Sequence, residues 1–319
     1  MKEITVGLFT YQRPNYLKRH LKFFKDLGYN FRLIILDGSH DKGLQGLNQK
    51  IAKTYNLEYF HIIDLKERYA FFSEKLDTEF AAWCADDDLI IPSFYNKAAN
   101  FLNENSQYSV VTGKLYTFHS WNMYGWKGYF LRNFLGNNYD IHLGDFVEKI
   151  VRKDQAYAMG CPNTYYGVRR SDNVKLFCKH INGLKLYSSI ERLENICNLL
   201  LGGMKVIDTL MGFRDYSSEP IREAQRDDPK VYISQEDADI LAKIISIELS
   251  GKYSGEMLKY YESYAWPLPL RPDQTGGKVA AYNKISRIES LLNLNFAHYF
   301  HDFDKDVTKA LRNAVTNIK

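Results

Sequence analysis

Three consecutive aspartates, Asp86, Asp87 and Asp88, form a dense cluster of negative charge between the apolar residues 80–84 and 89–92. Adjacent carboxylates repel one another unless a cation lies between them. Carboxylate oxygens are the hard ligands that Mg²⁺ and Mn²⁺ prefer, and a site with few protein carboxylates leaves other coordination positions to phosphate oxygens and water. The motif therefore predicts a Mn²⁺ or Mg²⁺ site at Asp86, Asp87 and Asp88, with a solvated acidic turn as the alternative.

The segments around the aspartates predict an α/β fold. Short apolar or β-branched runs alternate with segments of helical period. The predicted strands are residues 4–10, 31–36, 58–63 and 79–84, and the predicted helices between them are residues 15–24, 44–55 and 65–76. This alternation indicates a mostly parallel sheet flanked by helices, with right-handed crossovers. Ligands bind such sheets beyond the carboxyl ends of the strands, which is where Arg13, Asp37 and Asp86 fall.

The chain beyond the aspartates continues this pattern and then changes. The next predicted elements are a helix at 93–103 capped by Ser93, a strand at 109–118, a long functional loop or acceptor wall at 121–145, a strand at 164–168, a helix at 190–201 and a strand at 204–207. Residues 219–230 are highly charged with two prolines and predict a linker, and helices are predicted at 235–249, 254–264, 278–294 and 307–318. We therefore expect an α/β domain at residues 1–218 and a helical C-terminal region at residues 219–319.

The composition is that of a globular protein. Hydrophobic residues make up 45% and aromatic residues 15% of the chain, with 24 Tyr and 19 Phe, which excludes a disordered or fibrous protein. The net charge of +4 is too small and too dispersed to indicate nucleic-acid binding. The 4 cysteines lack the paired spacing of a zinc site or a disulfide framework, so we expect reduced thiols.

The sequence also predicts the compartment in which the protein acts. Its N-terminus lacks the long apolar core of a signal peptide, and no run approaches the length of about 18 apolar residues that a membrane span needs. We therefore expect a cytoplasmic protein. The small basic surplus leaves open a peripheral contact with the inner face of a membrane, and a homodimer also stays open.

Several motifs resemble, in the same order, those of the family 2 glycosyltransferases, which have the GT-A (Rossmann-like) fold. Thr-Tyr-Gln-Arg-Pro at residues 10–14 resembles the family's Thr-Tyr-Asn-Arg-Pro loop, and Asp-Gly-Ser-His-Asp at 37–41 resembles its Asp-Gly-Ser-x-Asp turn. Arg68 falls where the family has an Arg-Asn pair, residues 86–88 stand at its Asp-x-Asp position, and Gly-Met-Lys-Val at 203–206 resembles its Gly-Tyr-Lys-Val. The resemblance covers the predicted α/β domain and not the C-terminal region.

The resemblance implies a metal-dependent glycosyltransferase with Mn²⁺ or Mg²⁺ as cofactor. Such an enzyme moves a sugar from a nucleotide donor, here expected to be a UDP-sugar, to a hydroxyl group of a glycan, glycolipid or protein acceptor. The implied donor contacts are Thr10 and Tyr11 beside the base, Asp37 on the uracil N–H, Arg13 and Arg68 on ribose or phosphate, Asp86 on ribose, and Asp87 or Asp88 on the metal.

The resemblance also implies that Glu191 is the general base of an inverting reaction, because the family places its base at the start of the helix that leads into its final strand. A helix N-terminus favours the ionised carboxylate, the form that accepts a proton. Two positions depart from the family pattern. Counted back from the following proline, Ala85 takes the place of the first metal-motif aspartate, and Arg192 replaces the aspartate after the base. Glu194 is the alternative base.

Two other functions stay open. A sugar nucleotidyltransferase shares the parallel sheet and the acidic metal site, but it usually needs a glycine-rich basic loop after the first strand, and residues 10–15 lack those glycines. A non-catalytic carbohydrate-binding or scaffold protein on the same fold is supported by Arg192. We expect residues 219–319 to pack beside the acceptor cleft, with a dimerisation or membrane-surface role as the alternative.

Overall fold

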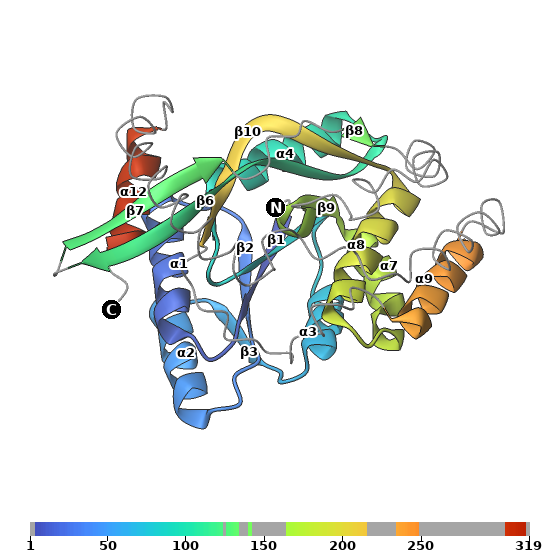
Figure 1. Ribbon diagram of the computed structural model, residues 1–319, viewed down its shortest axis with the longest axis horizontal. Coiled ribbons are helices and arrows are strands. Elements are labelled where there is room, and N and C mark those ends of the chain that lie inside the picture. Colours follow the sequence, from blue (N-terminus) through green and yellow to red (C-terminus); the bar gives the residue numbers. More distant parts are fainter. Residues whose placement is uncertain are drawn as a thin grey trace, which may run out of the picture.

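The computed structural model describes residues 4–123, 126–133, 140–141, 164–215, 234–248 and 304–316. Strands and helices alternate through the first half of the chain (Figure 1). In chain order the elements are β1 (Ile4–Thr10), α1 (Pro14–Leu27), β2 (Arg32–Asp37), α2 (Lys42–Thr54), β3 (Glu58–His61), α3 (Leu65–Glu74), β4 (Phe80–Ala85), β5 (Leu89–Ile90), α4 (Pro92–Glu104), β6 (Tyr108–Met123), β7 (Trp126–Asn133), β8 (Asp140–Ile141), η1 (Thr164–Tyr166), β9 (Val168–Arg170), α7 (Ser171–His180), η2 (Ile181–Gly183), α8 (Tyr187–Leu201), β10 (Gly203–Asp215), α9 (Gln235–Glu248) and α12 (Lys305–Thr316).

The strands of the described residues form one mixed sheet of 10 strands. Their order is β3-β2-β1-β4-β9-β6-β10-β5, with β7 paired to β6 and β8 paired to β10. Neighbours among β3, β2, β1 and β4 are parallel, whereas β9 is antiparallel to both β4 and β6. The predicted mostly parallel sheet is therefore confirmed for the first half of the chain, and later strands make it mixed.

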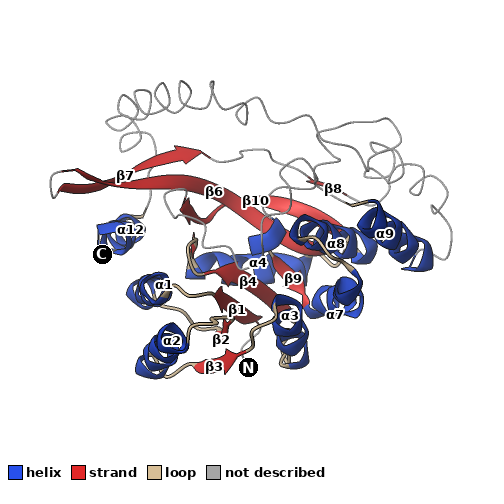
Figure 2. Cartoon of the chain, turned by 60° about the horizontal axis from the view of Figure 1, so that its bottom comes forward, coloured by secondary structure: helices blue, strands red, loops and turns tan. Residues whose placement is uncertain are grey.

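The central strands are buried on both faces, which is why they read as continuous apolar runs. Successive side chains of a strand point to opposite faces, so Cys84 of β4 enters one hydrophobic core and Trp83 enters the other. α1, α2 and α4 contribute to the first core, and α3, α7 and α8 contribute to the second (Figures 1 and 2). The sheet is thus a layer between two sets of helices.

The register of the parallel strands brings the predicted site loops together. Thr10 at the end of β1 pairs with Asp37 at the end of β2, and Phe9 pairs with Ala85 at the end of β4. Parallel strands have their carboxyl ends at the same edge of the sheet, where ligands of α/β folds bind. The loops after β1, β2 and β4 therefore start side by side.

Two predictions of local structure, a helix cap and a strand, were wrong. Ser93 does not cap α4, because the helix begins at Pro92 and its N-cap residue, Ile91, makes no side-chain capping bond. Proline suits the first helical position, since the N–H that it lacks would have no partner within the helix. The strand predicted at 164–168 is a 3₁₀ turn followed by the short strand β9.

The predicted loop at 121–145 is also partly wrong. β6 continues to Met123 and β7 returns beside it as an antiparallel hairpin, and the two-residue strand β8 pairs with β10. Backbone pairing between β6 and β7, which no local period signals, extends the sheet here. The remaining residues of this segment lie outside the described ranges.

The C-terminal region contributes two described helices to the two cores. Leu241 and Ile245 of α9 belong to the second core, beside α8. Leu311 and Ala314 of α12 belong to the first core, beside α1. These two residues lie on the buried side of the last helix. The predicted linker at 219–230 and the predicted helices at 254–264 and 278–294 fall outside the described ranges, and the domain division at residue 218 stays a prediction.

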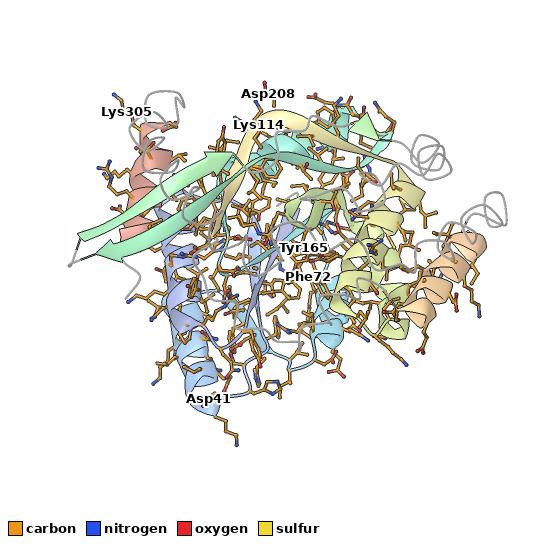
Figure 3. All side chains as sticks on the ribbon, in the orientation of Figure 1. Asp41, Phe72, Lys114, Tyr165, Asp208 and Lys305 are labelled. Atoms are coloured by element: carbon orange, nitrogen blue, oxygen red, sulfur yellow. The ribbon has the colours of Figure 1, made fainter. Side chains whose placement is uncertain are left out.

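Many charged residues lie at the periphery of the described structure and many aromatic residues in its interior. Phe72 lies in the interior, whereas the charged side chains of Asp41 and Lys305 are exposed at its periphery (Figure 3). Lys114 of β6 and Asp208 of β10 form an exposed ion pair. In the described part of the chain, no helix is both long enough and apolar enough to cross a membrane.

Replacing Leu311 with alanine is expected to lower the free energy of unfolding by about 2–5 kcal/mol, the usual cost of truncating a buried leucine. Leu311 is 1% exposed and packs in the core that α12 shares with α1. Urea denaturation measures the loss. Lys309→Ala, at an exposed position of the same helix, is the control and should change stability by less than about 0.5 kcal/mol. Equal unfolding midpoints for the two variants would contradict the packing of α12 on the sheet domain.

Candidate active site

The loops after β1 and β2 are bonded to each other. Gln12 has a φ of 54°, a left-handed conformation that residues other than glycine seldom adopt. Its N–H donates to Ser39 Oγ at 2.7 Å, and the N–H of Gly38 donates to the Thr10 carbonyl at 3.0 Å. Strained backbone of this kind persists where surrounding contacts hold it, and it is concentrated at functional sites.

Asp86 is enclosed by two other predicted site residues. Thr10 Oγ1 donates to Asp86 Oδ2 at 2.6 Å, and Arg13 Nη2 donates to Asp86 Oδ1. The side chain of Asp86 is 0% exposed. Burial raises the pKa of Asp86, and the positive charge of Arg13 opposes that rise. The predicted convergence of these residues at the strand ends is thus observed, with the carboxylate turned toward the protein.

Asp87 is the most exposed of the three aspartates, with a side chain that is 21% exposed. Arg13 Nη1 donates to Asp87 Oδ2 at 2.8 Å, so one guanidinium bridges Asp86 and Asp87. Arg19 donates through Nη2 to the main-chain oxygen of Asp87 and through Nη1 to Asp215 Oδ2, the latter at 2.6 Å. Two arginines therefore offset much of the negative charge of the motif.

Asp88 is held by two segments that are distant in the sequence. Its Oδ1 accepts the N–H of Asp215 at 2.8 Å, and its Oδ2 accepts the hydroxyl of Tyr166. Arg214 Nε lies 3.8 Å from the same Oδ2. Burial raises the pKa of Asp88, and it raises the pKa of Tyr166 well above its usual value. Asp88 therefore links β10 and η1 to the end of β4.

The donor set limits the kind of metal site that these residues can form. Within the described ranges, no group of three or more His, Cys, Asp or Glu side chains is arranged to hold a metal ion. All three aspartates supply hard oxygen donors, and all three accept hydrogen bonds within the protein. The side chains of Asp87 and Asp88 are 21% and 4% exposed, and that of Asp86 is 0% exposed. Mg²⁺ usually combines one or two protein carboxylates with substrate phosphates and water. The residues fit a cation of this type on Asp87 and Asp88, and the metal stays a prediction.

Asp37 lies at the centre of a buried hydrogen-bond network. Its Oδ1 accepts the Ser39 N–H at 2.8 Å. Its Oδ2 accepts Asn48 Nδ2 at 3.0 Å and the Tyr59 hydroxyl at 2.7 Å. A carboxylate offers about four acceptor positions, so these bonds fix its orientation and leave capacity for one more donor. The predicted bond to a uracil N–H stays a prediction.

Tyr11 and Arg68 complete the predicted donor side. The Tyr11 ring lies edge-on to His40, with ring centres 5.7 Å apart. Arg68 reaches from α3 and donates through Nη1 to the Thr10 carbonyl at 3.4 Å, and burial lowers the pKa of its guanidinium. The predicted donor residues are therefore gathered at the carboxyl ends of β1, β2 and β4, although they come from separate loops.

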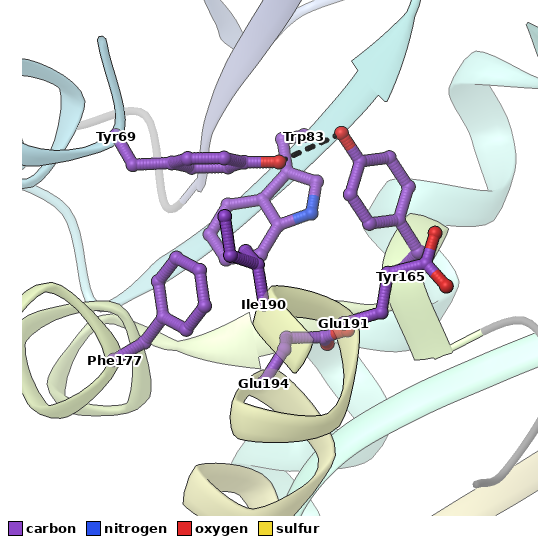
Figure 4. A pocket seen from close by; sticks show the side chains of 7 residues that line it. All are labelled: Tyr69, Trp83, Tyr165, Phe177, Ile190, Glu191 and Glu194. Atoms are coloured by element: carbon purple, nitrogen blue, oxygen red, sulfur yellow. Dashed lines mark hydrogen bonds between the residues drawn. The ribbon is translucent and has the colours of Figure 1, made fainter. Parts of the chain in front are cut away.

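Glu191 lines a pocket with aromatic walls between α3, β4, η1, α7 and α8 (Figure 4). Its other lining residues are Tyr69, Trp83, Tyr165, Phe177, Ile190 and Glu194. The hydroxyl groups of Tyr69 and Tyr165 are 2.9 Å apart and close one side. Trp83 stands on the strand that ends at the aspartates. The pocket therefore shares β4 with the donor side.

The position of Glu191 in its helix corrects one prediction. α8 begins at Tyr187 rather than near Ile190, so Glu191 lies in the second turn and not at the helix start. The field of a helix N-terminus falls off within the first turn, and it therefore contributes less to Glu191 than the sequence indicated. Glu191 is exposed, on the pocket side of the helix.

Glu194, the alternative base, is a buried structural group. It is 3% exposed, and its Oε1 accepts Arg169 Nη1 at 2.7 Å and Asn198 Nδ2 at 2.9 Å. Burial raises the pKa of Glu194, and Arg169 opposes the rise. These contacts argue against Glu194 as the base.

The sequence analysis missed three residues that bind the aspartates: Arg19, Tyr166 and Asp215. Arg19 could have been found from the sequence. It lies beside His20 on the buried side of an amphipathic helix, where a charged residue needs a buried partner. No comparable signal marked the other two. Arg169 and its neighbour Arg170 both pair with acids, Arg169 with Glu194 and Arg170 with Glu79.

Comparison with known proteins identifies the fold. No protein-family model and no curated protein matches the sequence. The structure of Staphylococcus aureus TarS 1-349 in complex with UDP-GlcNAc matches with a TM-score of 0.56 and 17% identity, over 82% of this chain and 72% of that chain. A longer TarS structure matches with a TM-score of 0.51 and 15% identity, and the match spans 44% of its length. The likeness confirms the predicted GT-A-like α/β fold.

Proposed function

We propose that this protein is a glycosyltransferase that transfers a sugar from a UDP-sugar to a hydroxyl group of a glycan or glycolipid. The observation that carries the proposal is the convergence of residues 10–13, Asp37 and residues 86–88 at the carboxyl edge of the sheet. The TarS structure with the same fold contains UDP-GlcNAc, which supports a nucleotide sugar as the ligand of this edge.

The charges of the site suit a nucleotide diphosphate. Arg13 and Arg19 border the aspartates, and Arg214, with a side chain that is 43% exposed, lies on the solvent side of Asp88. Guanidinium groups match the geometry of phosphate oxygens. A divalent cation on Asp87 and Asp88 would offset the charge that develops on a departing diphosphate.

On the acceptor side, we propose Glu191 as the general base of an inverting displacement. Glu191 is an exposed residue that lines the aromatic pocket, so an acceptor hydroxyl can approach it from solvent. Apolar walls around a reacting group exclude water and strengthen the electrostatic interactions within the site. Inversion requires the base to lie on the face of the sugar opposite the leaving diphosphate.

UDP is expected to bind this protein about 100-fold more tightly with Mn²⁺ than with EDTA, because a cation between the aspartates and the diphosphate contributes several kcal/mol. Calorimetric titration of UDP under the two conditions measures the difference. Asp88→Asn should weaken the binding of UDP with Mn²⁺. Asp208→Asn, an exposed acid on β10 that pairs with Lys114, is the matched control and should bind like the parent protein.

Three results would contradict parts of the proposed function. Equal, tight UDP binding in EDTA would remove the metal from the proposal. Release of diphosphate from UTP in the presence of a sugar 1-phosphate, with formation of the UDP-sugar, would favour the nucleotidyltransferase. UDP binding without any hydrolysis or transfer from UDP-sugars would favour the non-catalytic scaffold.

A further inference from the structure

Arg169 is a buried arginine at a junction of the site. It lies on β9 between β4 and β6, and its side chain is 1% exposed. The guanidinium carbon lies 3.7 Å from the centre of the Trp83 ring, a cation–π stack on the wall of the aromatic pocket. The two terminal nitrogens of the guanidinium donate hydrogen bonds to two different parts of the site.

One terminal nitrogen shapes the turn at residues 164–167. Arg169 Nη2 donates to three main-chain oxygens of this turn, at 2.8 Å to Thr164, 2.8 Å to Tyr165 and 3.1 Å to Gly167. The backbone is therefore curled around the guanidinium. At the centre of the curl stands Tyr166, whose hydroxyl donates to Asp88. The position of that hydroxyl depends on Arg169.

The other terminal nitrogen holds helix α8. Arg169 Nη1 donates to Glu194 at 2.7 Å, and Glu194 lines the same pocket as Glu191, less than one helical turn away. Thr164 Oγ1 bonds to Asn195 Oδ1 on the same helix and lies 3.4 Å from Glu194 Oε2, so the turn and the helix meet here. The ion pair thus joins the turn that binds Asp88 to the helix that carries the proposed base.

We infer that Arg169 is a positioning residue that places the Tyr166 hydroxyl on Asp88 and holds α8, with Glu191, at the rim of the pocket. The inference rests on the proposed function, in which Arg169 acts through other residues and does not contact the substrate. The role requires arginine, because a planar guanidinium offers five N–H donors in fixed directions and a lysine ammonium cannot bind both partners in this geometry.

The test variant combines Arg169→Met with Glu194→Met. Removing one partner of a buried ion pair leaves an unpaired charge and destabilises a protein strongly, whereas apolar replacement of both partners is often neutral. Tyr166→Phe removes only the hydroxyl that reaches Asp88. The matched control is Arg170→Met, since this neighbour on β9 binds main-chain oxygens outside the turn and an exposed acid, Glu79.

Hydrolysis of UDP-GlcNAc with Mn²⁺ gives kcat and KM for each variant. The paired Met variant is expected to lose about 100-fold in kcat, as misplacement of site groups by about 1 Å can cause, with a much smaller change in KM. Adding Tyr166→Phe to it should cause little further loss, because residues that act through one contact are not additive. Arg170→Met should keep the parent kcat. An unchanged kcat in the paired variant, or a fully additive effect of Tyr166→Phe, would overturn the inference.

Hydrogen exchange gives a readout that does not depend on turnover. The N–H of Gly167 donates to the Thr164 carbonyl at 2.8 Å, so its protection reports the turn. We expect this protection to be lost in the paired Met variant and kept in Arg170→Met. Retained protection in both would also overturn the inference. A parent protein that neither binds UDP nor hydrolyses UDP-GlcNAc would reject the proposed function instead, and exchange at Gly167 would still decide whether Arg169 sets the turn.

Discussion

Replacing Glu191 with glutamine is expected to lower the turnover of the proposed UDP-sugar donor by about 100- to 10,000-fold, the range that a general base contributes. Glutamine keeps the shape of the side chain at the pocket rim but cannot accept the proton of an attacking hydroxyl. UDP affinity should remain at the parent value, because Glu191 lines the aromatic pocket while the predicted nucleotide contacts lie at the strand ends. Steady-state kinetics and calorimetry measure the two quantities.

Glu104→Gln is a suitable control, because Glu104 is an exposed acid at the end of α4. Parent-like turnover in the Glu191 variant would reject the assignment of the base. Glu194→Gln tests the alternative. Glu194 is bound by Arg169 and Asn198. Glu194→Gln should therefore lower the free energy of unfolding rather than act directly on proton transfer.

The second large effect is expected from Arg13→Met, which should lower the free energy of unfolding by about 3–5 kcal/mol near pH 8, the cost of breaking a buried ion pair from one side. Arg13 bridges Asp86 and Asp87, and the side chain of Asp86 is 0% exposed. Without the guanidinium, the charged form of Asp86 has only Thr10 as a described side-chain donor. Urea denaturation measures the loss, and Lys18→Met, an exposed position on the same helix, provides the control.

The loss should depend on pH in a defined direction. Burial raises the pKa of Asp86, and removing Arg13 removes the charge that opposes this rise. The folded variant then holds a proton that the unfolded chain, with an ordinary aspartate pKa of about 3.9, releases. Its stability therefore falls as pH rises from about 4 toward the raised pKa, because the folded state binds more protons than the unfolded state.

Unfolding of Arg13→Met at pH 5 and pH 8 should thus show the larger loss at pH 8. Adding Asp86→Asn removes the titrating group and should remove most of this difference. A loss that is equal at both pH values, or one that survives in the double variant, would show that Arg13 stabilises the fold through something other than Asp86.

The sequence by itself determined the elements of the first half of the chain. Residues 4–10, 31–36 and 79–84 are apolar runs whose burial on both faces follows from their composition, and strand boundaries there agree within one residue. Period and apolar content are local properties, so they can be read without knowing the contacts. The same local logic placed Arg13 and the aspartates at strand ends, where the structure brings them together.

Only the tertiary structure decided which partners these groups take. Tyr166 and Asp215 reach Asp88 across large separations in sequence, and any of many tyrosines and aspartates has the same local pattern. The packing of α12 on α1 and the extension of β6 into a hairpin with β7 likewise depend on long-range pairing. The burial of Glu194 against Arg169, which separates it from Glu191 on the same helix, is set by the fit of three elements around one guanidinium. The periodicity of a sequence does not predict such contacts, because they form only when segments that are distant in sequence pack together in the folded protein.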